Sequence, residues 1–281
     1  MGSSASNGLL ITAQWTAAAR AWETERPDTH LTDPWAAQLA GEGAAWLSRQ
    51  PSDAGLTPVL RTRFIDDLLS QCLQQTPIRQ VVLVAAGLDM RAYRLALPED
   101  TRLFEIDQAE GLAYKEHVLA PLQLVPQCQR ICVPADLTEA WADLLVKAGF
   151  QMHHRALWMV EGLLMYLGAS AHQLMATLSQ LASPGSWLGL DVIEKDTPTA
   201  RQLGALLTSQ PHPTIAGRFG VDEPPCWLQD LGWKASISTL EETGRRFGRW
   251  LSPSPSSSRT DLPHMMLVAA QREESPTAPS T

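Results

Sequence analysis

Acidic side chains lie at the ends of several apolar segments of this chain. Asp107, Asp136, Glu161 and Asp191 each lie at or near the end of a short apolar run, and Gly87 follows the first such run. A single acid at such a position is usually just solvated. An ordered set is more informative, because in an open α/β sheet ligands bind outside the carboxyl ends of the strands. The pattern therefore predicts a single site where carboxylates bind hydroxyl, amino or cationic groups of a small ligand.

The turn after the first apolar run distinguishes two kinds of nucleotide-like ligand. A dinucleotide site needs three glycines, for a tight turn and for close approach to a pyrophosphate. Residues 85–89 read Ala-Ala-Gly-Leu-Asp, with one glycine, and Asp89 would repel a phosphate. Asp107 nevertheless lies twenty positions after Gly87, where an acid binds ribose hydroxyls. A nucleoside without phosphate fits better, and S-adenosylmethionine is the common one. An NAD-dependent oxidoreductase is the disfavoured alternative.

Other residues can meet the remaining groups of S-adenosylmethionine. Asp107 suits the ribose, and Asp136 with the backbone N–H of Leu137 could meet the adenine edge. Arg61 or Arg63 could hold the carboxylate, because a guanidinium binds a carboxylate through two parallel hydrogen bonds. Acidic surroundings would also suit the positively charged sulfonium. We therefore expect S-adenosyl-L-methionine as the cofactor and no metal ion.

The segments that carry these residues alternate between strand-like and helix-like patterns. Apolar runs of strand length occupy residues 80–86, 101–106, 130–135, 155–160 and 186–193. Helical periodicity follows the middle three runs, at residues 109–122, 137–149 and 170–183. Strands that are apolar on both faces and alternate with helices indicate a parallel sheet covered on both sides. Two more strand-like segments follow, at 233–240 and 264–272. We therefore expect a doubly wound α/β fold.

The rest of the chain is expected to surround this sheet within a single domain. We expect a helical cover at 1–60, a ligand-binding core at 61–193, a helical lid insertion at 194–225, C-terminal strands at 226–272 and a disordered tail at 273–281. Apolar residues at helical spacing predict an amphipathic helix at 61–75, before the first strand. Residues 24–34 should break the N-terminal helical region in two. The cover and the lid are the parts that we expect to close over a bound substrate.

Composition and charge exclude several classes of partner. The chain has 281 residues and a formal net charge of −8 at pH 7. This acidity argues against nucleic acid or an anionic membrane as the main partner. No apolar stretch reaches the ~18 residues that span a bilayer. The four cysteines lack metal-ligand spacing, which favours reduced thiols in a cytoplasmic protein. We expect a small-molecule substrate, and the oligomeric state stays open.

Several stretches of the chain together resemble one family. They are "TAQWTAAARAWETERPD", "LTDPWAAQLAG", "RTRFIDDLL", "VVLVAAGLDMRAYRL", "LFEIDQAEGLAYKE", "ADLTEAW", "LWMVEGLLMYL" and "RRFGRW". Spread from about residue 12 to residue 270, they resemble the leucine carboxyl methyltransferase family, particularly its bacterial branch of small-molecule and polyketide O-methyltransferases. The resemblance implies a class I methyltransferase with a seven-stranded, mostly parallel, Rossmann-like sheet, an N-terminal helical region and a helical lid.

The resemblance also implies roles for individual residues. Arg61 would bind the carboxylate of the cofactor. Gly87 and Glu161 would line its methionine portion, and Tyr166 would lie near the transferred methyl group. The residues expected to bind the cofactor are, in full, Arg61, Arg63, Ala85, Gly87, Asp107, Gln108, Asp136, Leu137 and Glu161.

Two residues depart from the family pattern. The family turn usually begins Gly-Ala-Gly, where this chain has Ala85, and Met90 replaces the usual threonine. A methyl group at Ala85 narrows the turn slightly. We expect this to affect the affinity for the cofactor and not its identity.

The reaction implied is O-methylation of a natural-product-like small molecule by in-line displacement at the sulfonium methyl. A carboxylate acceptor requires no general base, whereas a hydroxyl acceptor does. Tyr166 and His212 are the candidate catalytic residues. No histidine stands at any of the strand ends, so we favour a small natural-product acid slightly over a phenol. The alternative from another class is a cofactor-binding protein without turnover, which a methyl-transfer assay would distinguish.

Overall fold

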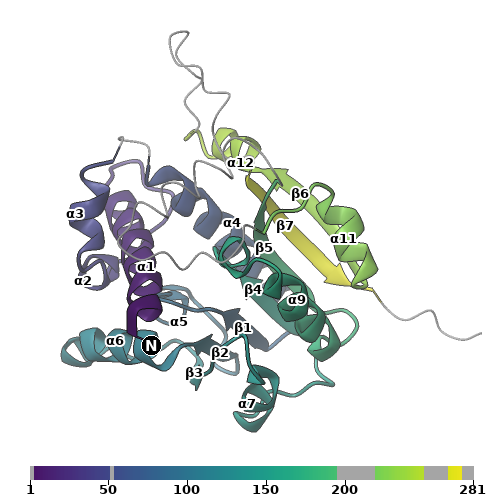
Figure 1. Ribbon diagram of the computed structural model, residues 1–281. Helices are drawn as coiled ribbons and strands as arrows, with labels where there is room; N and C mark the ends of the chain where they lie inside the picture. The colour runs from purple at the N-terminus through teal and green to yellow at the C-terminus, as the bar shows by residue number, and fades with distance from the viewer. Residues whose placement is uncertain (1–2, 51–53, 195–218, 250–264, 274–281) are drawn as a thin grey trace, which may run out of the picture.

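A seven-stranded sheet forms the centre of the computed structural model, which describes residues 3–50, 54–194, 219–249 and 265–273 (Figure 1). The strands are β1 Gln80–Val84, β2 Arg102–Asp107, β3 Gln129–Pro134, β4 Ala156–Val160, β5 Trp187–Ile193, β6 Trp233–Thr239 and β7 Met265–Arg272. Their order is β3-β2-β1-β4-β5-β7-β6. β7 pairs antiparallel with β5 and β6, and the other paired strands are parallel. The predicted fold class is confirmed.

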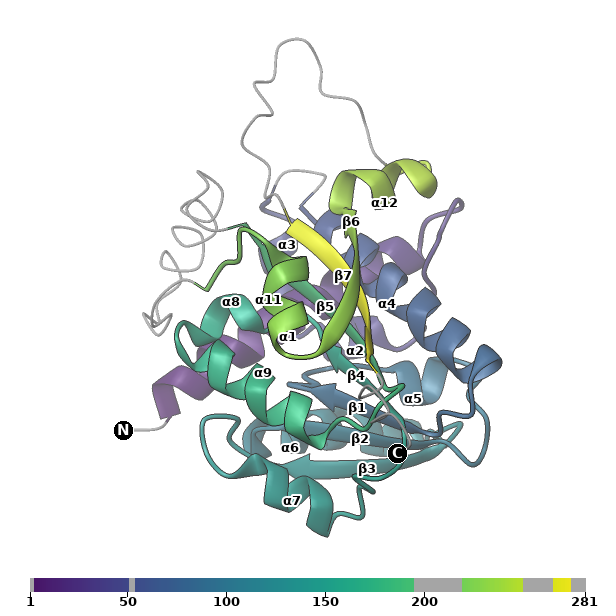
Figure 2. The ribbon, with the colours of Figure 1, turned by 90° about the vertical axis from the view of Figure 1, so that its right-hand side faces the viewer.

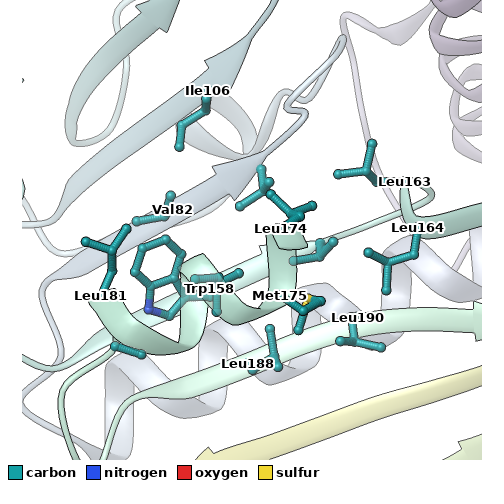
Figure 3. Packing of buried hydrophobic residues seen from close by; sticks show 14 of the residues in the cluster. Val82, Ile106, Trp158, Leu163, Leu164, Leu174, Met175, Leu181, Leu188 and Leu190 are labelled. Carbon is teal, nitrogen blue, oxygen red and sulfur yellow. The ribbon is translucent and has the colours of Figure 1, made fainter. Parts of the chain in front are cut away.

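Helices cover both faces of the sheet (Figures 1 and 2). One face carries α4 Leu56–Gln75 and α6 Ala109–Leu119, and the other carries α7 Trp141–Lys147, α9 Ser170–Leu181 and α11 Pro224–Asp230. Side chains alternate between the faces of a strand, so each strand contributes to two hydrophobic cores. Val81 of β1 packs in the core that includes α4, whereas Val82 packs in the core that includes α9. Figure 3 shows this second core, where Trp158 of β4 lies near α9.

The observed strands agree with the predicted ones. All seven predicted segments form strands, and their ends differ from the prediction by at most two residues. The helices differ more, because α4 begins at Leu56 and α7 begins at Trp141. At α7, the Asp136 carboxylate accepts hydrogen bonds from the N–H and the hydroxyl of Thr138, and this local turn delays the helix. Of the predicted lid insertion, residues 195–218 lie outside the described part of the chain.

The N-terminal region forms three helices beside the sheet, as Figure 1 shows. They are α1 Ser3–Thr24, α2 Ala36–Leu39 and α3 Gly43–Leu47, and the predicted break follows α1. α3 crosses α1 so closely that a Cβ on Gly43 would lie 2.3 Å from the backbone of Gln14. Only glycine permits this approach. Within the part of the chain that the structure describes, no helix has both the length and the apolar character to cross a membrane.

A buried arginine, Arg249, connects this N-terminal region to the C-terminal part of the chain. Arg249 follows α12 (Leu240–Arg246), and its side chain is largely buried. Its Nη2 donates a 2.8 Å hydrogen bond to Glu23, and its Nη1 donates one of the same length to Asp28. Two of the stretches that carry the family resemblance, "TAQWTAAARAWETERPD" and "RRFGRW", therefore meet in space.

Candidate functional site

A cavity of about 350 Å³ lies at the carboxyl ends of β1, β2 and β4. Its wall is completed by α1, by α4, by the start of α6 and by the loop after β4. The volume falls in the range of sites for small molecules. Seven of the predicted site residues line it: Arg61, Ala85, Gly87, Asp107, Gln108, Glu161 and Tyr166. Of the strand-end residues expected to form one site, Gly87, Asp107 and Glu161 share this cavity, whereas Asp136 and Asp191 are outside its lining.

The Asp107 carboxylate joins the ends of β1 and β2. Its Oδ2 accepts a 2.5 Å hydrogen bond from the N–H of Gly87, and its Oδ1 accepts a 2.7 Å bond from the N–H of Gln108. Burial raises the pKa of this carboxyl, and the two backbone donors act in the opposite direction. Each oxygen has further lone pairs, so Asp107 can hold the turn and still accept hydrogen bonds from a ligand.

The turn after β1 uses a backbone conformation that favours glycine at two positions. Gly87 has φ of +52°, and Ala85 has φ of +58°. A non-glycine residue in this region loses roughly 1–2 kcal/mol through its Cβ. The departure from the family glycine at Ala85 therefore carries a cost in backbone strain, in a residue that also lines the cavity.

Glu161 is held by three donors in the loop after β4. Its Oε1 accepts hydrogen bonds from Thr62 Oγ1 at 2.7 Å and from Arg61 Nε at 3.2 Å. Its Oε2 accepts a 2.7 Å bond from Arg91 Nη2. Burial alone would raise the pKa of Glu161, but the two guanidinium groups and the Thr62 hydroxyl outweigh it and lower the pKa to about 2. Glu161 is therefore an anion at every physiological pH and a very weak base.

Arg61 lies between two carboxylates, and its side chain is 10% exposed. Beyond its bond to Glu161, its Nη1 lies 3.7 Å from Asp191 Oδ2, which is outside hydrogen-bond distance. Gly162 has φ of +65°, and a Cβ there would lie 2.8 Å from the Arg61 guanidinium nitrogens. A side chain at position 162 would thus displace the guanidinium. The Nη nitrogens are the part of Arg61 that can bind a ligand carboxylate.

Tyr166 lies in α8 (Leu164–Leu167) and lines the same cavity. Burial raises the pKa of its phenol to about 12, although Arg61 and a hydrogen bond with Thr12 act to lower it. Near neutral pH the phenol therefore keeps its proton and can donate a hydrogen bond. Thr12 belongs to α1, so this contact also joins the N-terminal cover to α8.

Three predicted cofactor-binding residues lie outside the cavity lining. Arg63 donates hydrogen bonds to Asp67 and to the carbonyl oxygen of His30, and these are the contacts of a structural surface residue. Asp136 is exposed at the end of β3, and Leu137 packs against the core shared with α7 and α9. The candidate catalytic residue His212 lies outside the described residues.

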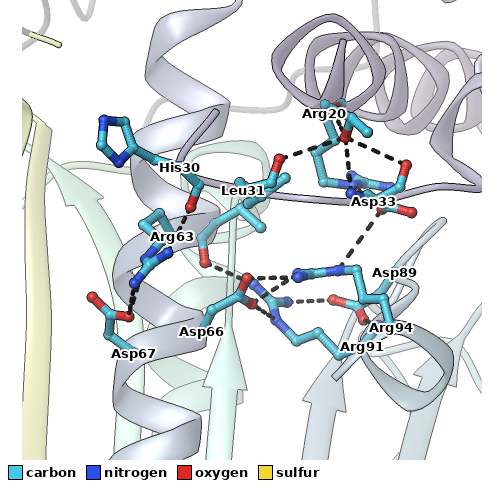
Figure 4. A network of polar contacts seen from close by, with 12 residues as sticks. Arg20, His30, Leu31, Asp33, Arg63, Asp66, Asp67, Asp89, Arg91 and Arg94 are labelled. Carbon is cyan, nitrogen blue, oxygen red and sulfur yellow. Dashed lines mark hydrogen bonds and ion pairs between the residues drawn. The ribbon is translucent and has the colours of Figure 1, made fainter. Parts of the chain in front are cut away.

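A buried polar network behind the cavity contains residues that sequence analysis did not include in the site (Figure 4). Arg91 and Arg94, at the two ends of α5, both bind the Asp66 carboxylate of α4, and both also line the cavity. Arg20 of α1 donates a 2.7 Å hydrogen bond to the carbonyl oxygen of Leu88. The available signal was Asp66 itself, an acid on the otherwise apolar face of a predicted amphipathic helix.

The cavity suits S-adenosylmethionine in size and in chemistry. Asp107 offers acceptors for ribose hydroxyls, and Arg61 offers donors for a carboxylate. Four carboxylates and four arginines line the cavity. Asp89 and Glu161 are paired with arginines, which leaves Asp107 and Glu110 as the acids that suit the amino and sulfonium cations. Among the described residues, no group of three or more histidine, cysteine or acidic side chains is arranged to hold a metal ion.

Comparison with known proteins identifies the family. The sequence profile of the leucine carboxyl methyltransferases matches residues 13–182. A Streptomyces coelicolor protein, provisionally named an S-adenosyl-L-methionine-dependent methyltransferase, is 35% identical over 278 residues, which cover 95% of this chain and 96% of that protein. A Frankia alni protein of the same provisional name is 36% identical over 288 residues, covering 95% of this chain and 96% of its own length.

Solved structures agree on the fold. A protein of the DUF574 family from Streptomyces avermitilis superposes with a TM-score of 0.60 at 12% identity, covering 91% of this chain and 96% of that one. A provisionally named methyltransferase from Thermobifida fusca gives a TM-score of 0.59 at 13% identity, with 93% and 94% of the two chains covered. The chain therefore belongs to the leucine carboxyl methyltransferase family and is an S-adenosyl-L-methionine-dependent methyltransferase.

Proposed function

We propose that this methyltransferase is an O-methyltransferase whose acceptor is the carboxylate of a small, natural-product-like molecule. One observation carries the choice of carboxylate: the described residues that line the cavity include no histidine, cysteine or lysine. Tyr166, with a pKa of about 12, keeps its proton, and Glu161, with a pKa of about 2, is too weak a base. A phenol, with a pKa of about 10, would lose its proton to a carboxylate only against a gap of several pKa units. An acceptor that is already ionised needs no such transfer.

The chain's own contribution is to bind and position the reactants. The cofactor, when bound, supplies a methyl group activated by its sulfonium. In our proposal Arg61 holds its carboxylate, Asp107 its ribose, and Gly87 allows the backbone to approach closely. Tyr166 donates a hydrogen bond near the site of transfer. Positioning and exclusion of water can supply most of the rate when the donor is already activated. The roles of Asp136 and Leu137 at the adenine stay predictions.

α1 supports the proposal that the N-terminal region covers the site. Leu10, Thr12, Ala13, Thr16 and Arg20 of this helix all line the cavity. Ala13 lies close enough to the turn that a Cβ on Gly87 would be 3.5 Å from its methyl group. The turn at Gly87 thus packs close to α1, and this helix closes one side of the cavity against bulk water.

The test is the pH dependence of kcat with an acceptor found by screening small carboxylic acids and phenols with labelled cofactor. A carboxylate acceptor should give a rate that is nearly flat from about pH 6 to 9, because its own pKa lies well below that range. A tenfold rise per pH unit through neutrality, abolished by His212→Ala, would identify a base-assisted hydroxyl methyltransferase instead. Cofactor binding without turnover of any acceptor would favour the non-catalytic alternative.

A further inference from the structure

We propose that Asp66 is a positioning residue for the carboxylate end of the cofactor. It would act through Arg91 and Glu161, which together orient the Arg61 guanidinium. The inference rests on the proposed role of Arg61 as the group that holds that carboxylate. Asp66 itself does not line the cavity, so any effect on the ligand must pass through its partners.

Asp66 is buried, with 7% of its surface exposed, and binds two arginines at once. Its Oδ1 accepts hydrogen bonds from Arg91 Nε at 2.6 Å and from Arg94 Nη2 at 2.8 Å. Its Oδ2 accepts a 2.7 Å bond from Arg94 Nη1. Arg94 is thus held bidentately, in a geometry that fixes the plane of its guanidinium. Asp66 therefore fixes two cations behind the turn that follows β1.

Arg91 connects Asp66 to Glu161, a residue that lines the cavity. Its guanidinium is planar, and it uses all three of its nitrogens: Nε for Asp66, Nη1 for Asp89 and Nη2 for Glu161. Once the first two bonds are set, the direction of Nη2 is determined, because the fork is rigid. The residue is 2% exposed, so water cannot replace a lost partner freely. The position of Glu161 Oε2 consequently depends on Asp66, while Thr62 holds Oε1.

Glu161 completes the chain of contacts. Its Oε2 is held by Arg91 at 2.7 Å, while its Oε1 accepts the bond from Arg61 Nε at 3.2 Å. Holding Nε leaves the Nη edge of Arg61, whose Nη1 lies 3.7 Å from Asp191 Oδ2, as the edge available to a ligand carboxylate. If Asp66 no longer holds Arg91, this edge loses its fixed direction, and the ligand must order it on binding.

The experiment compares two ligands that differ at one end. S-adenosylhomocysteine carries the amino-acid portion, whereas 5′-methylthioadenosine has the same adenosine and thioether without it. We expect Asp66→Asn to weaken S-adenosylhomocysteine binding about 10- to 100-fold in calorimetry, the scale of a lost hydrogen bond to a charged group. Binding of 5′-methylthioadenosine should change by less than about twofold. If Asp66 has a purely structural role, Asp66→Asn would lower the affinities for both ligands equally, or would lower only the fraction of protein that is folded.

Two controls keep the test sharp. Asp67→Asn alters the neighbouring acid, whose partner Arg63 lies outside the cavity lining, and should leave both affinities unchanged. If Asp66→Asn fails to fold, Asp66→Glu keeps the buried charge, displaces the carboxylate by one methylene, and should show the same ligand-specific loss in smaller measure. Circular dichroism and the melting temperature report folding independently of ligand binding.

A double-mutant cycle tests the role of Asp66 separately from the proposal that Arg61 binds the carboxylate of the cofactor. Arg61→Met should itself lower the affinity for S-adenosylhomocysteine and leave the affinity for 5′-methylthioadenosine unchanged. If it does not, Arg61 is not the residue that binds the carboxylate of the cofactor. If it does, Asp66→Asn should add less than about twofold in the Arg61→Met background. A full additional loss there, or an unchanged affinity for S-adenosylhomocysteine in Asp66→Asn alone, would overturn the positioning role of Asp66.

Discussion

Two positions on the carboxyl edge of the sheet, after β4 and after β3, hold their acids in different ways. After β4, Glu161 accepts hydrogen bonds from two arginines and a threonine inside a buried network. After β3, Asp136 is exposed and accepts from Thr138, two residues along the chain. The first carboxylate is fixed by groups from other elements, whereas the second belongs to its own turn. An acid in a tertiary network is in place before a ligand arrives; an acid in a local turn can reorient.

The position of each strand in the sheet explains the difference. β4 lies between β1 and β5, and all of its residues are buried. β3 is an edge strand, and half of its residues are exposed. Elements on both sides can reach the end of an inner strand, but only one neighbouring strand flanks an edge strand. The site is consequently rigid around the expected carboxylate end of the cofactor and open around the expected adenine end.

Removing the half-buried Glu161 carboxylate should have the largest effect. Glu161→Ala leaves Arg61 and Arg91 without their shared partner, and we expect the free energy of unfolding to fall by about 3–5 kcal/mol, as for other broken buried ion pairs. Urea denaturation at equilibrium measures this. Glu161→Gln keeps the shape and one acceptor oxygen, so it should lose less. A loss below about 1 kcal/mol in Glu161→Ala would mean that the network contributes little rigidity.

Removing the Asp107 carboxylate, which ends β2 and binds the turn after β1, should lower the affinity for the cofactor more than the stability of the fold. Asp107→Ala should cost about 2–3 kcal/mol of S-adenosylhomocysteine affinity, the scale of charged hydrogen bonds to the ribose. Unlike Asp66→Asn, this substitution should also lower the affinity for 5′-methylthioadenosine, because both ligands carry the ribose. Calorimetry checks both. Normal binding, or loss of the fold, would show that Asp107 serves only to hold the N–H groups of Gly87 and Gln108.

Removing the exposed acid should have a smaller effect on stability. Asp136→Ala loses the two hydrogen bonds to Thr138, and we expect the free energy of unfolding to fall by about 0.5–1 kcal/mol, as for the loss of a local cap. If Asp136 binds adenine as predicted, the affinities for S-adenosylhomocysteine and 5′-methylthioadenosine should both fall by a similar factor of about ten. Unchanged affinities for both would remove Asp136 from the site and leave the β3 end without a ligand-binding acid.

Relieving the strain in the turn should give the smallest effect. Ala85→Gly removes a Cβ from a position with φ of +58°, and we expect a gain of about 0.5–1 kcal/mol in stability, which is the strain relieved less the extra freedom of glycine in the unfolded chain. Thermal denaturation with and without S-adenosylhomocysteine measures it. A loss of stability would mean that the methyl group makes packing contacts that outweigh the strain.

Much of this architecture follows from short-range patterns. The runs at 80–86 and 155–160 predicted β1 and β4, because a strand buried on both faces must be apolar throughout. The acids that follow these and neighbouring runs predicted Asp107 and Glu161 as residues of one site, because parallel strands bring their carboxyl ends to one edge. Both conclusions need only the local sequence and the geometry of parallel sheets.

The partners of these acids depend on distances that the sequence does not contain. Asp66 lies 25 positions from Arg91 and 28 from Arg94, and Arg91 lies 70 from Glu161. Nothing in local periodicity distinguishes this network from the surface pair of Arg63 and Asp67, four residues apart on the same helix. Residue types alone do not distinguish Arg61 from Arg63, although the family resemblance favours Arg61. Two residues separated by two positions point to different sides of a helix, and packing selects Arg61 for the cavity.

Three features can be predicted from the sequence alone: the order of strands and helices along the chain, the acids at the strand ends and the single glycine that argues against a pyrophosphate. Hydrophobic periodicity and turn chemistry act over a few residues, so they can be read without the fold. The contacts of Glu161 with Arg61 and Arg91, the exposure of Asp136 and the strain at Ala85 become visible only in the folded chain. Each of these depends on burial and on partners from distant elements, and the free energy of a buried charge is set by the groups that surround it in space.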